Sequence, residues 1–99
     1  MYRASTPQQK FILPFDVNQY VEKLLITYTQ DEIVFEKKLV DVKVEGNTIF
    51  YDLTQEETNL FNSNKSVKLE IRVKTKNGKV LPSKTYILPV YDVLNDEVL

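Results

Sequence analysis

The stretch from Val67 to Lys74 alternates strictly between aliphatic and charged residues. Because successive side chains of a β-strand point to opposite faces, this period of two predicts a strand with one buried and one solvated face. Asn77-Gly78 follows, a dipeptide favoured where the central residues of a hairpin turn need a positive φ. Val80 and then Tyr86 to Leu88 supply residues for a returning strand. The pattern therefore predicts a β-hairpin in this part of the chain.

A second hairpin is predicted between Val40 and Leu53. Aliphatic and charged residues alternate from Val40 to Glu45, and after Gly46-Asn47 a further alternation runs from Ile49 to Leu53. Gly46 can adopt the left-handed conformation that such a turn requires. The chain has 2 glycines, and both occupy predicted turns, which indicates that each turn is specified by the sequence.

Two further segments have the composition of strands. Leu24 to Thr29 alternates, Gln30-Asp31 interrupts, and Ile33 to Phe35 resumes, which predicts a third hairpin with no glycine in its turn. Phe11 to Phe15 contains Pro14, which cannot donate to a sheet ladder, so this segment is predicted to be an edge strand.

One short helical turn is predicted after residue 54. Thr54 and Glu57 fit a capping box, in which each side chain accepts the other residue's backbone N–H, and Leu60-Phe61 follow. Asp16 to Lys23 merges into the strand pattern after it and is interpreted as a loop.

About seven strands with a turn signal every eight to twelve residues are typical of an all-β, immunoglobulin-like antiparallel sandwich. The predicted helical turn then connects the fifth and sixth strands and crosses from one sheet to the other. A chain of 99 residues has the usual size of one domain, so residues 1–99 are predicted to form a single β-sandwich domain. The segments 1–9 and 92–99 complete no core, and we interpret them as flexible or partner-binding ends.

Composition excludes several classes of function. The chain has no His and no Cys, which removes Ser-His and Cys-His nucleophile pairs, disulfides and thiolate metal sites. Its 13 basic and 14 acidic residues are interspersed, and a net charge of −1 gives no long-range attraction for a polyanion. We therefore expect no enzyme, no catalytic, cofactor-binding or metal-binding residues and no cofactor. Without an apolar run of about 18–20 residues or a signal-peptide pattern, no membrane partner and a cytoplasmic location are expected.

Adjacent acidic pairs are the remaining candidates for carboxylate chemistry. They are Asp31-Glu32, Glu56-Glu57 and Asp96-Glu97. Each is explained more simply, as a turn, a helix start and a solvated tail respectively.

Basic residues concentrate on the last predicted hairpin. They are Lys65, Lys68, Arg72, Lys74, Lys76, Lys79 and Lys84. Alternate positions of a strand share a face, so a surface for nucleic acid is one interpretation. Glu70 lies in the same row and favours the other, a solvated face with charged residues that oppose aggregation. Tyr2, Phe50 and Tyr91 fit either a core or a contact surface.

Several stretches of the chain together carry a resemblance to known proteins. They are MYRASTP at the start, LPFD at 13–16, LLITYTQ at 24–30, VEGNTI at 44–49, LTQEET at 53–58, EIRVKT at 70–75 and DVLNDEVL at 92–99. With these stretches the chain resembles small proteins encoded by phages and prophages of Gram-positive bacteria. The resemblance implies a phage-related structural module, such as a virion or tail component, and it brings no site residues with it.

The leading hypothesis is a non-enzymatic structural or protein-interaction module of phage origin. Its expected partners are other phage structural proteins or further copies of itself, in the host cytoplasm or in a virion. The alternative is a module that binds nucleic acid or carbohydrate on an exposed sheet face. The absence of Trp weakens the carbohydrate version, and the balanced charge weakens the nucleic-acid version.

Overall fold

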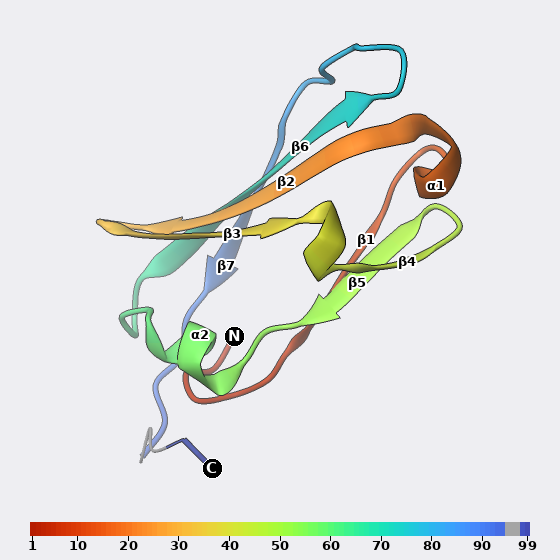
Figure 1. Cartoon of the computed structure of the whole chain (residues 1–99). Helices are drawn as coiled ribbons and strands as arrows, with labels where there is room; N and C mark the ends of the chain where they lie inside the picture. Colours follow the sequence, from red (N-terminus) through yellow and green to blue (C-terminus); the bar gives the residue numbers. More distant parts are fainter. Residues whose placement is uncertain (95–97) are drawn as a thin grey trace.

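The computed structural model describes residues 1–94 and 98–99, which form two antiparallel sheets (Figure 1). A three-stranded sheet has the order β1-β5-β4, and a four-stranded sheet has the order β3-β2-β6-β7. The elements in chain order are β1 (Gln8–Ile12), α1 (Val17–Tyr20), β2 (Val21–Gln30), β3 (Ile33–Lys38), η1 (Leu39–Asp41), β4 (Lys43–Glu45), β5 (Thr48–Asp52), α2 (Gln55–Asn59), β6 (Ser66–Thr75) and β7 (Lys84–Pro89).

This strand order is that of an immunoglobulin-like sandwich. In such folds strands B, E and D share one sheet, and strands G, F, C and C′ share the other. The seven described strands correspond in chain order to B, C, C′, D, E, F and G. The predicted fold class, an all-β immunoglobulin-like sandwich, is therefore confirmed, and α2 is the predicted connector between the fifth and sixth strands.

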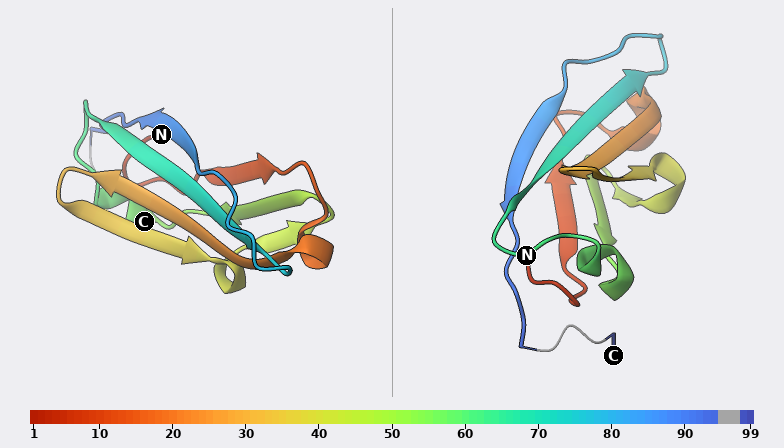
Figure 2. Two further views of the ribbon diagram at one scale, coloured as in Figure 1. Left: turned by 90° about the horizontal axis from the view of Figure 1, so that it is seen from above. Right: turned by 90° about the vertical axis from the view of Figure 1, so that its left-hand side faces the viewer.

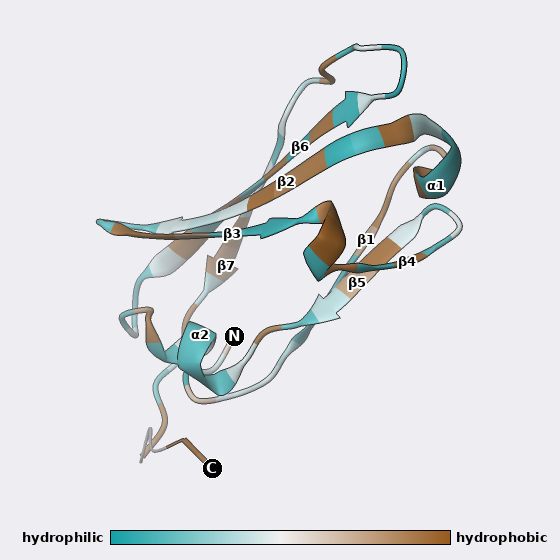
Figure 3. Cartoon of the chain, in the orientation of Figure 1, coloured by the Kyte–Doolittle hydropathy of each residue, from teal (hydrophilic) through white to brown (hydrophobic). Residues whose placement is uncertain are grey.

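The core lies between the sheets and is built mainly from β2, β5 and β6. Their alternate residues face inward, as the register pairs Ile26 with Ile71 and Tyr28 with Leu69. Hydrophobic and hydrophilic bands succeed one another along β2 (Figure 3). The buried apolar residues are Leu13, Val17, Val21, Leu24, Ile26, Tyr28, Ile49, Tyr51, Leu53, Phe61, Val67, Leu69, Ile71, Val73 and Val90.

Both glycines have the positive φ that the turn pattern predicts, +60° at Gly46 and +86° at Gly78. No atom would clash with a Cβ added at Gly78, so only the backbone conformation opposes a side chain there. Gly78→Ala is expected to lower the free energy of unfolding by about 1–2 kcal/mol, measured by urea denaturation. Gly78→Asn is the matched control and should lower it less, because Asn tolerates this conformation better. Equal losses would contradict this explanation.

The loop interpretation of Asp16 to Lys23 was wrong, because α1 and the start of β2 occupy it. The Asp16 carboxylate accepts the Gln19 N–H at 2.9 Å and caps the helix, while Val17 is buried in the core. One cap and one buried anchor are enough to hold a single turn in place.

The strand predicted from Val40 to Glu45 is wrong in its first half, where η1 replaces it and β4 begins at Lys43. The Asp41 carboxylate accepts the backbone N–H of Lys38 at 2.8 Å, which closes the turn. Leu39 packs against the core, and Val40 is left 91% exposed. The chain passes here from β3 in one sheet to β4 in the other. Because this connection must turn, residues whose pattern predicts a strand form η1 instead.

The edge position predicted for the first strand is confirmed, since β1 pairs with β5 alone among the described strands. Pro14 is not part of it, because β1 ends at Ile12.

The capping box predicted at the start of the helical turn is also confirmed. Thr54 N–H donates to Glu57 Oε1 at 2.9 Å, and Glu57 N–H donates to Thr54 Oγ1 at 3.1 Å.

The described part of the chain is elongated, with extents of 47 × 25 × 18 Å. The loop between β6 and β7 projects at one end, and both termini lie toward the other (Figures 1 and 2). The N-terminal residues are joined to the segment after β7, since Tyr2 and Tyr91 form a parallel bridge with rings 5.1 Å apart.

Candidate functional site

The outer face of the four-stranded sheet brings basic residues from three strands together. Leu25 pairs with Lys38 of β3 on one side and with Arg72 of β6 on the other. In the adjacent row Lys23 pairs with Lys74, which bridges to Val80. Directly paired residues of antiparallel strands point to the same face, so these side chains share the outer surface.

These residues line an open pocket of about 510 Å³ at the end of the sheet next to the β6–β7 loop. We call it the basic pocket. Its full lining is Glu22, Lys23, Leu24, Leu25, Lys38, Leu39, Val40, Arg72, Val73, Lys74 and Val80. Val40 is 91% and Val80 59% exposed, so aliphatic surface meets water within a basic rim.

The four cations of the pocket, Lys23, Lys38, Arg72 and Lys74, have no ion-pair partner among the described residues. Glu22 is the one acidic residue in the described lining. Glu36 and Glu70, both paired with Thr27, face the same side one row further along and limit the basic area in that direction. The result is a local excess of positive charge on a chain whose net charge is −1.

The predicted basic surface of the last hairpin is divided by the register. Arg72 and Lys74 enter the basic pocket, whereas Lys68 lies further along the same outer face. Lys84 pairs with Ile71 and so belongs to the other face. The remaining three lie outside β6 and β7: Lys65 pairs with Asp31 at 3.0 Å, Lys76 Nζ donates to the Asn18 carbonyl at 2.6 Å, and Lys79 follows the turn glycine.

Lys23 and Lys38 were missed by the sequence analysis, although they complete the pocket. They lie 15 positions apart and far from Arg72 in the sequence, so only the pairing of β2 with both β3 and β6 brings them together. The weak signal available was a lysine near one end of each predicted strand.

The acidic pairs have structural roles where they are described. Asp31-Glu32 forms the turn between β2 and β3, with Asp31 at φ +52°. Glu56-Glu57 lies in the first turn of α2, and Glu57 also forms an ion pair with Lys37 at 2.6 Å. Asp96-Glu97 lies outside the described residues.

A buried tyrosine pair between the sheets was also missed. The hydroxyls of Tyr28 and Tyr51 are hydrogen-bonded, and Phe35 stacks on Tyr28 with ring centroids 4.7 Å apart. Burial raises the pKa of Tyr28 above its ordinary value and raises the pKa of Tyr51 to about 12. Both phenols are protonated near neutral pH, and their hydrogen bond links β2 of the four-stranded sheet to β5 of the three-stranded sheet.

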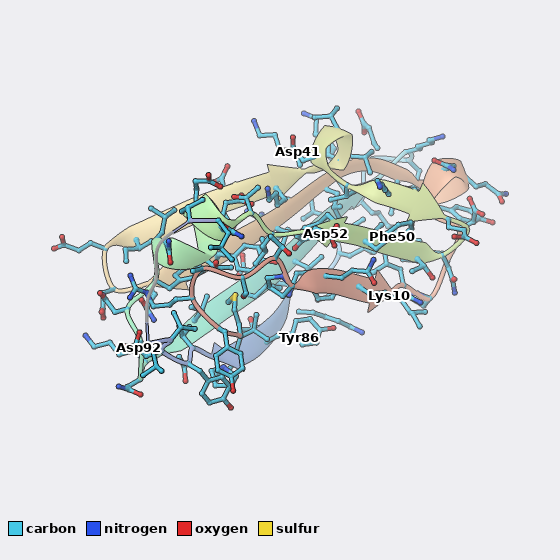
Figure 4. All side chains as sticks on the ribbon, turned by 90° about the horizontal axis from the view of Figure 1, so that it is seen from below. Lys10, Asp41, Phe50, Asp52, Tyr86 and Asp92 are labelled. Carbon is cyan, nitrogen blue, oxygen red and sulfur yellow. The ribbon has the colours of Figure 1, made fainter. Side chains whose placement is uncertain are left out.

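A second surface lies on the outer face of the three-stranded sheet. Phe50 is half-buried between Lys10 of β1 and Lys43 of β4, which pair with it on either side (Figure 4). Asp52 lies on the same strand face, and Glu45 lines the adjoining pocket. This face therefore carries both signs of charge, unlike the basic pocket.

The structure thus defines an all-β sandwich with immunoglobulin-like strand order and a basic, aliphatic-lined pocket on one sheet. Comparisons of the chain with protein-family models, curated proteins and solved structures found no match. The resemblance to phage and prophage proteins stays a prediction. In the described part of the chain no helix has the length and apolarity to cross a membrane, and no three His, Cys, Asp or Glu residues gather as a metal site would require.

Proposed function

We propose that this chain is a non-enzymatic protein-interaction module whose basic pocket binds an acidic, aliphatic segment of a partner protein. The observation that carries the proposal is that one lining combines exposed aliphatic side chains with four cations that form no ion pair with any described residue. Carboxylates of a partner would pair with the cations, and its aliphatic side chains would cover Leu25, Val40 and Val80.

A protein segment fits this lining better than nucleic acid or carbohydrate. Proteins that hold single-stranded nucleic acid stack its bases on aromatic side chains, and the described pocket lining contains none. The same absence removes a platform for a sugar ring. Phe50, on the other sheet, is half-buried between two lysines.

The absence of an enzymatic role is supported by the residues themselves. The chain has no His or Cys, and Asp31-Glu32 and Glu56-Glu57 are used by a turn and a helix start. The phage-like stretches of the sequence support the finer proposal that the partner is another structural protein of a particle.

The proposal is tested with a labelled peptide of alternating aspartate and leucine, titrated by fluorescence anisotropy at low salt. The double substitution Lys38→Glu and Arg72→Glu is expected to weaken binding at least about tenfold, which corresponds to about 1.4 kcal/mol. Raising the salt concentration should weaken the wild-type complex as well, because exposed charges are screened.

The matched control carries the same charge change outside the pocket, at Lys10 and Lys68, which lie on other parts of the two sheet faces. It should bind the peptide within about twofold of wild type. Equal weakening in both double variants would contradict the site. Binding of a single-stranded oligonucleotide in preference to the peptide, lost in the pocket variant, would favour the nucleic-acid alternative.

A further inference from the structure

The segment Asp92–Leu99 of this chain has the chemistry that the basic pocket fits. Its sequence, DVLNDEVL, combines three acidic residues with four aliphatic ones. Among the described residues of this segment, Leu94 and Leu99 are fully exposed and Val98 is 45% exposed. The Leu99 N–H donates to Gln55 Oε1 of the same molecule at 2.6 Å, so docking on a second copy must exchange this backbone contact. Its side chain remains exposed, and exposed leucines are typical of contact surfaces.

The segment cannot fill the pocket of its own molecule. Tyr91 is anchored beside the N-terminus, since its N–H donates to the Met1 carbonyl at 2.7 Å and its carbonyl accepts the Arg3 N–H at 3.1 Å. Ser66 pairs with Pro89 near this anchor, and Lys74 lies about 26 Å further along β6. Eight extended residues span at most about 29 Å, so only the last residue of the segment could approach the pocket.

The pocket lies beside the β6–β7 loop. That loop and the C-terminus lie toward opposite ends of the elongated described chain (Figures 1 and 2). We propose that the segment Asp92–Leu99 of one copy docks in the basic pocket of a second copy, an inference that rests on the proposed function of that pocket. Asp92 stays beside Arg3 of its own molecule, with which it forms an ion pair at 3.6 Å. The acidic residues that follow it in the sequence meet the four cations of the pocket, and the aliphatic residues cover Leu25, Val40 and Val80.

The contact is heterologous, because each copy offers the pocket at one end and the segment at the other. When two copies associate in this way, one copy still has a free pocket and the other a free segment. Further copies can therefore add, and association leads to a ring or an open filament and not to a symmetric dimer.

Analytical ultracentrifugation of three forms of the chain tests this inference. The wild type is expected to show oligomers that grow with concentration and shrink with salt. The pocket variant, Lys38→Glu with Arg72→Glu, and a segment variant, Leu94→Ser with Leu99→Ser, should each remain monomeric at the same concentrations. All four substituted side chains lie on the surface or line the open pocket, so the fold should be retained, as circular dichroism would verify.

Mixing the two variants provides the decisive measurement. The pocket variant keeps a competent segment and the segment variant keeps a competent pocket, so the mixture should form 1:1 dimers that grow no further. The variant with Lys10→Glu and Lys68→Glu controls for net charge and should associate as the wild type does.

The outcomes separate the two proposals. A wild type that stays monomeric at millimolar concentration, while its pocket still binds the acidic peptide, overturns head-to-tail assembly and leaves the proposed function standing. A wild type that neither binds the acidic peptide nor associates with itself overturns both proposals. Association that persists in either variant alone places the contact elsewhere and overturns the inference.

Discussion

Replacing Leu69 with alanine is expected to lower the free energy of unfolding by about 2–5 kcal/mol. Leu69 is 0% exposed in the middle of β6, opposite Tyr28 of β2 and between Val67 and Ile71 on the inner face. Truncation leaves a cavity that the two sheets cannot close, in addition to the lost burial of the side chain. Urea denaturation monitored by circular dichroism measures the loss.

The control for this substitution lies one strand away. Ile87 of β7 pairs with Lys68 on the outer face and is 68% exposed, so Ile87→Ala should change stability by no more than about 0.5 kcal/mol. Comparable losses at the two positions would mean that the inner and outer faces of this sheet have been assigned wrongly.

Leu69 also shows what the sequence can predict about this fold. Its inward orientation follows from the alternation between Val67 and Lys74, and the hairpin follows from Asn77-Gly78. Both signals are local: a period of two and a residue that adopts a positive φ. Such signals were sufficient to predict about seven strands and a sandwich, because β2, β5 and β6 each have one strongly apolar face.

The elements that the sequence did not reveal depend on contacts made elsewhere. Val40 and Asp41 begin an alternation like that of a strand but belong to η1, because the chain must leave one sheet and enter the other at this point. Gln30 was interpreted as a turn residue, yet it is the buried end of β2. Its side chain accepts the Asn62 N–H at 2.6 Å and donates to the Asn62 carbonyl at 2.9 Å. That partner is 32 positions away and has no local signature.

The basic pocket could be predicted only in part for the same reason. Arg72 and Lys74 share a face by their spacing within one strand, which the sequence shows directly. Lys23 and Lys38 join them through the pairing of β2 with two neighbours, and a one-residue change of register would move either lysine to the other face. Charge patterns within a strand are therefore readable here, whereas clusters across strands need the topology.

The hydrogen-bonded pair Tyr28–Tyr51 leads to the second prediction of large effect. Either single substitution to phenylalanine leaves the other hydroxyl buried without this partner, and should lower the free energy of unfolding by about 1–3 kcal/mol. The double substitution removes both polar groups and should be more stable than the sum of the two single losses predicts. A double-mutant cycle in urea measures this coupling, and additive losses would show that the hydroxyl contact contributes nothing.

The same pair is expected to limit stability at alkaline pH. Burial raises the pKa of both phenols above the value of about 10 that tyrosine has in an unfolded chain, and the pKa of Tyr51 reaches about 12. The folded protein then holds protons that the unfolded chain releases, so their contribution is complete below about pH 10 and is lost as the pH rises further. The double phenylalanine variant lacks these groups, and its stability should fall less than that of the wild type above about pH 10. Parallel pH profiles of the two proteins would show that ionisation of this pair does not set the alkaline limit.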